Sequence, residues 1–267
     1  MSPAIARRPR IVAGNWKMHK TSPEGAALAR ELAALGAADP ASSTAPIVVL
    51  CPAAPALESV ARALAGSGMA LGAQNVHSEP AGAFTGEVSG AMLRAAGCTW
   101  VIVGHSERRH GMGETDAQVA AKLRAAQRDG LTPIVCVGET LAEREKGQTE
   151  AVLVRQVTTA YHGLGPDAAQ ATAIAYEPVW AIGTGKVATP EQARDAHRVV
   201  RATLDRVLGS GAGGKAAILY GGSVNAGNAA ALFAEADVDG ALVGGASLEF
   251  LEGKVLPGVA ALDGAST

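Results

Sequence analysis

The feature that most constrains the fold is the regular alternation of two kinds of segment along the 267 residues. Short apolar segments with the composition and length of buried strands recur eight times, and Ala- and Leu-rich stretches with helical spacing separate them. The expected strands are residues 11–14, 47–51, 70–74, 100–104, 132–137, 172–176, 216–220 and 240–243. Such alternation predicts an α/β fold in which helices connect parallel strands.

Polar residues that commonly begin helices precede several of the Ala- and Leu-rich stretches. The expected helix starts are 21–24, 115–116, 149–150, 189–191 and Asn225. An open doubly wound sheet also alternates strands and helices, but eight units without a linker or a composition break favour closure into a barrel. We therefore predict a single (β/α)8 TIM-type barrel domain over residues 1–267, with a short solvated N-terminal arm and a C-terminal tail of open extent after Leu248.

Charge and composition exclude several classes of partner. The formal net charge is −2, which provides no global field for nucleic acid or an anionic membrane. Charged residues, Gly or Pro interrupt every apolar run before it reaches the roughly 20 residues that span a bilayer. Cys51, Cys98 and Cys136 lack metal-ligand spacing, so we expect buried reduced thiols and a cytoplasmic location. We expect no metal, no cofactor, no nucleic acid and no membrane.

In a parallel barrel the carboxyl ends of the strands converge on one face, where active sites form from the loops that follow. This rule selects candidate residues before any motif is considered. The candidates are Asn15, Lys17, Gln74, Asn75, His105, Glu177, Ser223, Gly244 and Gly245.

Glu177 ends the sixth expected strand and precedes an apolar loop that contains glycines, residues 178–186. A carboxylate that a closing loop desolvates becomes more basic, as proton abstraction near neutral pH requires. The alternative interpretation is a Glu at the barrel mouth that pairs with Arg or Lys, and the residue alone leaves both open.

His105 and Lys17 are candidates for stabilising negative charge. His105 follows a strand and precedes a potential helix start, where the helix dipole favours a neutral imidazole that donates a hydrogen bond. Lys17 could hold a fixed positive charge beside an enolate or a phosphate. The alternatives are a structural His and a solvated surface Lys, although the neighbouring Trp16 and Met18 make simple exposure less natural.

Two glycine-rich turns follow the last two expected strands, at Gly221-Gly222-Ser223 and at Gly244-Gly245. Either pair alone could be an ordinary turn. Backbone N–H groups in these two loops, with a short helix N-terminus, form a frequent phosphate site in barrels. The two turns together favour phosphate binding.

Five motifs in order along the chain resemble the triosephosphate isomerase family. They are Asn15-Trp-Lys17-Met18, His105-Ser-Glu-Arg-Arg109, the segment from Ala175 to Lys186, Tyr220-Gly-Gly-Ser223 and Gly244-Gly-Ala-Ser247. The resemblance implies a cofactor-free isomerase of glycolysis and gluconeogenesis that acts on a small phosphorylated three-carbon substrate.

The resemblance also implies a role for each matching residue. Glu177 would be the base and His105 the electrophile, while Asn15 and Lys17 would contact the substrate. The phosphate would bind at Gly183, Ser223, Gly244 and Gly245, and Ile182 and Leu242 would desolvate Glu177. A loop after the third strand, residues 75–88, would make the protein a homodimer, with a buried Phe84 and with Thr85 near the neighbouring subunit's active site.

Two other functions are compatible with parts of this pattern. The same acid and base could isomerise a four-carbon sugar phosphate. A catalytically silent barrel that binds sugar phosphates is a different class, but binding alone would not require the set of Asn15, Lys17, His105 and Glu177.

Overall fold

The computed structural model describes residues 8–34, 46–184, 186–225 and 227–248. The predicted tail after Leu248 and most of the predicted arm lie outside these residues, so the prediction of one domain over 1–267 stays a prediction. The described end of the arm differs from the expected solvated chain. Nε of Arg8 lies 2.7 Å from Oδ1 of Asp239, because this buried carboxylate at the start of the last strand attracts the guanidinium.

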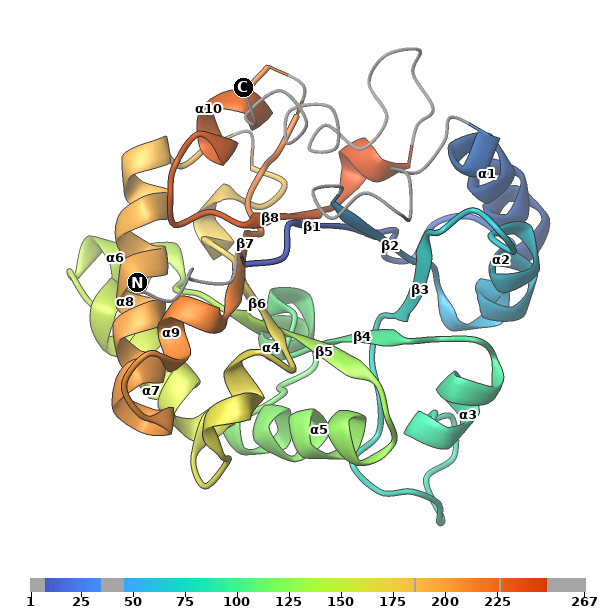
Figure 1. Ribbon diagram of the computed structural model, residues 1–267, viewed down its shortest axis with the longest axis horizontal. Coiled ribbons are helices and arrows are strands. Elements are labelled where there is room, and N and C mark those ends of the chain that lie inside the picture. The colour runs from blue at the N-terminus through green and yellow to red at the C-terminus, as the bar shows by residue number, and fades with distance from the viewer. Residues whose placement is uncertain (1–7, 35–45, 185, 226, 249–267) are drawn as a thin grey trace, which may run out of the picture.

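Among the described residues, eight parallel strands form a closed barrel in chain order, which confirms the predicted fold (Figure 1). The last strand pairs with the first, with Ile11 opposite Gly240 and Val12 opposite Ala241. The strands are β1 (Ile11–Asn15), β2 (Ile47–Cys51), β3 (Ala70–Ala73), β4 (Trp100–Val103), β5 (Thr132–Val137), β6 (Ala173–Tyr176), β7 (Ala217–Tyr220) and β8 (Gly240–Val243).

Helices surround the barrel and cover the outer faces of the strands (Figure 1). They are α1 (Ser22–Ala34), α2 (Leu57–Ala63), α3 (Gly90–Ala95), α4 (Ser106–Gly111), α5 (Asp116–Arg128), α6 (Leu141–Glu145), α7 (Thr149–Tyr161), α8 (Pro190–Leu208), α9 (Ala212–Lys215) and α10 (Ala229–Phe233). In the described part of the chain, no helix has the length and apolar character needed to cross a membrane.

The strands are buried on both faces, so the core has two layers. Alternate residues such as Ile11 and Ala13 point into the barrel, where they pack with Ile134 and other small or branched side chains. The intervening residues, such as Val12, pack against the surrounding helices. This division explains why the strands are continuous apolar runs rather than alternating polar and apolar ones.

Capping interactions place some helix starts as expected and others differently. The side chains of Thr115 and Thr189 accept from the N–H groups of Gln118 and Gln192 in reciprocal capping boxes. Asn225 was expected to begin a helix, but α10 begins at Ala229. The reason is local. Oδ1 of Asn225 accepts hydrogen bonds from the backbone N–H groups of Gly227 and Asn228, which form a turn before the helix.

Candidate active site

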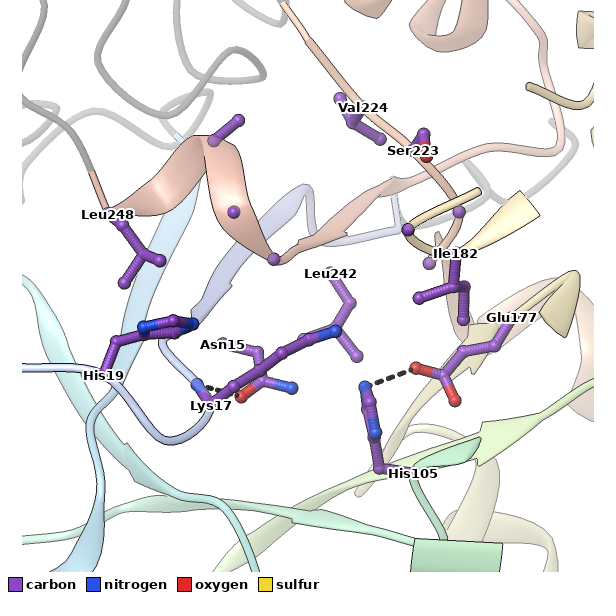
Figure 2. A pocket seen from close by; sticks show the side chains of 16 residues that line it. Asn15, Lys17, His19, His105, Glu177, Ile182, Ser223, Val224, Leu242 and Leu248 are labelled. Atoms are coloured by element: carbon purple, nitrogen blue, oxygen red, sulfur yellow. Dashed lines mark hydrogen bonds and ion pairs between the residues drawn. The ribbon is translucent and has the colours of Figure 1, made fainter. Parts of the chain in front are cut away.

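The carboxyl ends of the strands meet around a cavity of about 400 Å³ (Figure 2). The cavity brings together residues from loops far apart in the sequence, as the barrel rule predicts. Among the residues that line it are ten named from the sequence: Asn15, Lys17, His105, Glu177, Ile182, Gly183, Ser223, Leu242, Gly244 and Gly245. Gln74 and Asn75 instead line a neighbouring pocket, which Asn15, Lys17 and His105 also line.

His105 and Glu177 form the closest pair of titratable groups in this cavity (Figure 2). Nε2 of His105 lies 3.0 Å from Oε1 of Glu177, and both side chains are buried. The backbone N–H of Ser106 donates to Oε2 of Glu177 (2.8 Å). The backbone N–H of Glu107 donates to Nδ1 of His105 (3.2 Å). An acceptor at Nδ1 leaves the ring proton on Nε2, where it can be donated.

The pKa of Glu177 lies below its ordinary value, whereas the sequence expectation of a more basic carboxylate concerned Glu177 beneath a closed loop. Burial raises this pKa. The attraction of His105 and the hydrogen bonds from His105 and Ser106 lower it by more than burial raises it. For His105, burial lowers the pKa and the Glu177 carboxylate raises it above the ordinary value. Glu177 is paired here, so the expected rise of its pKa beneath a closed loop stays a prediction.

Lys17 spans the cavity between His105 and the loop after β8 (Figure 2). Its Nζ lies 2.5 Å from Oε1 of Glu107, and its backbone N–H donates to Oδ1 of Asn15 (3.0 Å). A Cβ built on Gly244 would lie 3.4 Å from Cε of Lys17. Lys17 has a left-handed backbone, with φ of 51°, which is unusual for a residue with a side chain. Such local strain is typical of functional sites.

The lid segment expected after Glu177 begins with a short 3-10 turn, Val179–Ala181. Nε1 of Trp180 donates to Oε1 of Glu139 (2.9 Å), and the hydroxyl of Ser223 donates to the carbonyl of Ala181 (2.7 Å). Gly183 is exposed at the tip with φ of 67°, a conformation that favours glycine. The base of the segment is anchored while its tip projects into solvent.

The two glycine pairs differ in what surrounds them. A Cβ on Gly221 would lie 2.8 Å from Cγ of Glu177, so this glycine makes room for the carboxylate. A Cβ built on Gly245 would instead meet open space. Gly245 begins a 3-10 turn, Gly245–Ser247, and Gly244 is the residue before it. The loop after β8 therefore lines the cavity with residues that have little or no side chain, so an anion could approach the backbone there.

Sequence reasoning missed several residues of the site. Glu107 pairs with Lys17, Glu139 binds the lid, and His19 and Leu248 line the wall opposite Glu177 (Figure 2). His19 could have been found, because it follows Lys17 by two residues after the same strand. The contact of Glu139 with Trp180 could not, since Trp180 is 41 residues away in sequence.

Exposed apolar side chains gather near the neighbouring pocket. Met18 and Met112 line this pocket and are 93% and 70% exposed. Phe84 is 42% exposed in the single chain, so its expected burial in a neighbouring subunit stays a prediction. The ring lies against His77 of its own loop, with 4.1 Å between the centroids and the two planes tilted by 37°. Among the described residues, no group of three or more His, Cys, Asp or Glu could hold a metal ion.

Comparisons with known proteins agree with this geometry. The family model described as triosephosphate isomerase matches residues 10–255. The chain is 54% identical over 244 residues to a protein of Thiobacillus denitrificans, with 90% of this chain and 94% of the relative covered. Identity is 51% over 242 residues to a protein of Chlorobium luteolum, with coverage of 90% and 94%. Both relatives are named triosephosphate isomerase. The barrel, the cavity with its paired His105 and Glu177, and similarity over nine-tenths of the sequence place the chain in the triosephosphate isomerase family.

Proposed function

We propose that the activity of the chain, isomerisation of a triose phosphate, is carried out by Asn15, Lys17, His105 and Glu177. The reaction interconverts dihydroxyacetone phosphate and glyceraldehyde 3-phosphate, which share one enediol or enediolate. The observation that carries these roles is the buried contact of 3.0 Å between Nε2 of His105 and Oε1 of Glu177 in the cavity. A base and a hydrogen-bond donor are thus held beside the same space.

Glu177 removes a proton from the carbon next to the substrate carbonyl and returns it to the adjacent carbon. Its lowered pKa keeps it ionised at neutral pH in the free enzyme. To reach the substrate, the carboxylate leaves His105 and the N–H of Ser106. It then becomes more basic because the hydrogen bonds that lower its pKa are lost, while burial still raises the pKa and only the charge of Lys17 opposes it. The lid closes over the site and completes this desolvation through Ile182 and Leu242.

His105 donates from Nε2 to the substrate oxygens and moves protons between them. Once Glu177 has left, the larger of the two carboxylate influences that raise the pKa of His105 is lost and only that of Glu107 remains. Burial, the charge of Lys17 and the N–H of Glu107 at Nδ1 favour the neutral ring. Lys17 offsets the negative charge that develops on the enediolate, and Asn15 orients the substrate. Gly183, Ser223, Gly244 and Gly245 bind the phosphate.

The working assembly is a homodimer in the cytoplasm. The exposed side chains of Met18, Phe84 and Met112 support the dimer, because apolar residues at the rim of a pocket are typical of interaction sites. Thr85 is exposed beside Phe84, at the tip of the loop that would enter the partner's pocket. Free, buried Cys51, Cys98 and Cys136 support a reducing compartment.

A coupled assay with purified protein tests the substrate. We expect kcat/KM to be higher for glyceraldehyde 3-phosphate than for a four-carbon sugar phosphate. A clear preference for the four-carbon compound would reject the three-carbon phosphate as the preferred substrate. It would not contradict the proposed acid and base roles.

A further inference from the structure

Gln156 is a buried polar residue on the inner face of α7. The side chain is 5% exposed and lies in a stripe that otherwise contains apolar residues and Tyr161. Burial of an amide costs free energy unless hydrogen bonds replace those to water. The partners of Gln156 therefore indicate why a polar residue occupies this position.

Both polar atoms of the amide bind a single residue, Gly138. The backbone N–H of Gly138 donates to Oε1 of Gln156 (2.8 Å), and Nε2 of Gln156 donates to the carbonyl of Gly138 (3.3 Å). Gly138 is the first residue after β5, where the hydrogen bonds of the strand ladder stop. Two hydrogen bonds from Gln156 on α7 thus hold the backbone at the end of β5 in place.

Gly138 packs directly on the backbone of Glu177. A Cβ built on Gly138 would lie 1.7 Å from the carbonyl oxygen of Glu177, so only a glycine allows this approach. The N–H of Glu177 also donates to the carbonyl of Val137 (2.7 Å). A displacement of Gly138 therefore displaces the residue that carries the carboxylate.

The next residue, Glu139, holds the base of the lid. Its Oε1 accepts from Nε1 of Trp180, and its carbonyl accepts from the N–H of Val179 (3.1 Å). The short segment 137–139 thus contacts both the backbone of Glu177 and the start of the lid.

We infer that Gln156 is a positioning residue for the isomerisation, acting through Gly138 on Glu177 and through Glu139 on the lid. The inference rests on the proposed function, in which Glu177 is the base. A Gln156 with a merely structural role would contribute to stability and leave turnover unchanged.

The test compares Gln156→Met with a matched control on the same helix, Tyr161→Phe. The first variant keeps the side-chain length and loses both bonds to Gly138. The control loses the buried bond of 2.7 Å between the hydroxyls of Tyr161 and Thr172, next to the opposite end of β6. The measurements are kcat, KM, the inhibition constant of inorganic phosphate, and the thermal unfolding midpoint.

We expect both variants to unfold at lower temperature, but kcat to fall only in Gln156→Met. The loss is about 10-fold or more, because small misplacements of reacting groups have large effects on rate. KM and the phosphate inhibition constant stay within about threefold of wild type, since Ser223, Gly244 and Gly245 are not moved. Equal kcat in the two variants would overturn the inference.

If Gln156→Met does not fold, Gln156→Asn replaces it. The shorter amide cannot reach both atoms of Gly138, so kcat is expected to fall in the same way, and unchanged kcat would overturn the inference. Glu177→Gln separates this outcome from a failure of the proposed function. An inactive Glu177→Gln beside a fully active Gln156 variant rejects the positioning role alone, whereas an active Glu177→Gln rejects the base.

Discussion

Charged side chains at the two ends of the barrel differ in how they are paired. At the carboxyl end, Glu177 and His105 pair with each other in a cavity that remains open to a ligand. Lys17 lies in the same cavity and bonds to the half-exposed Glu107. These pairs can exchange partners when a substrate enters.

At the amino end, charges are locked in a network with the backbone. Oδ2 of Asp239 accepts from Nη2 of Arg201 (2.5 Å) and from the N–H of Ile218 (2.8 Å), while Oδ1 pairs with Arg8. Arg201 also donates to the carbonyls of Gly213 and Ala216. Under the proposed function, the barrel thus separates the charges that react from this network of charges that stabilises it.

The largest expected effect is at the carboxyl end, in Glu177→Gln. The amide preserves size but cannot accept the substrate proton, so we expect kcat to fall about 10³-fold or more. The unfolding free energy should change by only about 1 kcal/mol, because the amide oxygen can still accept from Ser106. Steady-state kinetics and urea unfolding check both, with inorganic phosphate binding as the control for an intact site. Large losses of both activity and stability would contradict the idea that reacting and stabilising charges lie at different ends of the barrel.

The reciprocal change at the amino end is Asp239→Asn. It leaves Arg201 and Arg8 without the charge of a nearly buried carboxylate, so we expect a loss of about 3 kcal/mol in unfolding free energy. The kcat of the folded variant should match wild type. Urea unfolding measures the unfolding free energy and the coupled assay measures kcat. A reduced kcat with normal stability would show that the charges at the amino end do not only stabilise the barrel.

Thr85→Arg tests whether the carboxyl end needs a second subunit. A bulky charge at the loop tip should weaken the proposed interface, so that activity at low protein concentration falls about tenfold with dissociation, the equivalent of 1.4 kcal/mol. Sedimentation and activity are measured across protein concentration. Thr158→Arg on the exposed face of α7 is the control. A folded Thr85→Arg monomer with full activity would reject the dimer requirement.

The smallest effect concerns pH and His197, outside the cavity on α8. Burial lowers the pKa of His197 to about 4, below its ordinary 6.5. Between these values the unfolded chain binds a proton that the folded chain does not, so stability falls as the pH falls. When the pH falls from about 7 to about 5.5, the unfolding free energy of wild type should decrease by about 1 kcal/mol more than that of His197→Gln. Equal losses in urea unfolding would mean that His197 does not contribute.

The sequence predicted the barrel and the cavity well, because both follow from local patterns. Each strand was expected to within one residue, since buried parallel strands are short apolar runs bounded by breaks. Placing Glu177 and His105 in one cavity followed from the rule that strand ends converge. Those positions need no knowledge of individual side-chain contacts.

Properties that depend on contacts distant in sequence were not predictable. The lowered pKa of Glu177 was not predicted, because it depends on His105 and the N–H of Ser106, which follow a different strand. The partnership of Gln156 with Gly138 has no signal in the pattern of α7, where a single buried Gln is compatible with many neighbours. The exposure of Phe84 was likewise not predicted, because the sequence expectation placed this ring in a proposed subunit interface.

The most direct test of Glu177 as the base is hydrogen exchange from solvent during turnover in deuterium oxide. Wild type should incorporate deuterium at carbon into product, because the proton held on Glu177 can exchange before it returns to the substrate. A folded Glu177→Gln protein that still binds inorganic phosphate should incorporate almost none. Near-normal incorporation by this variant would contradict the account, because another group would then be removing the proton.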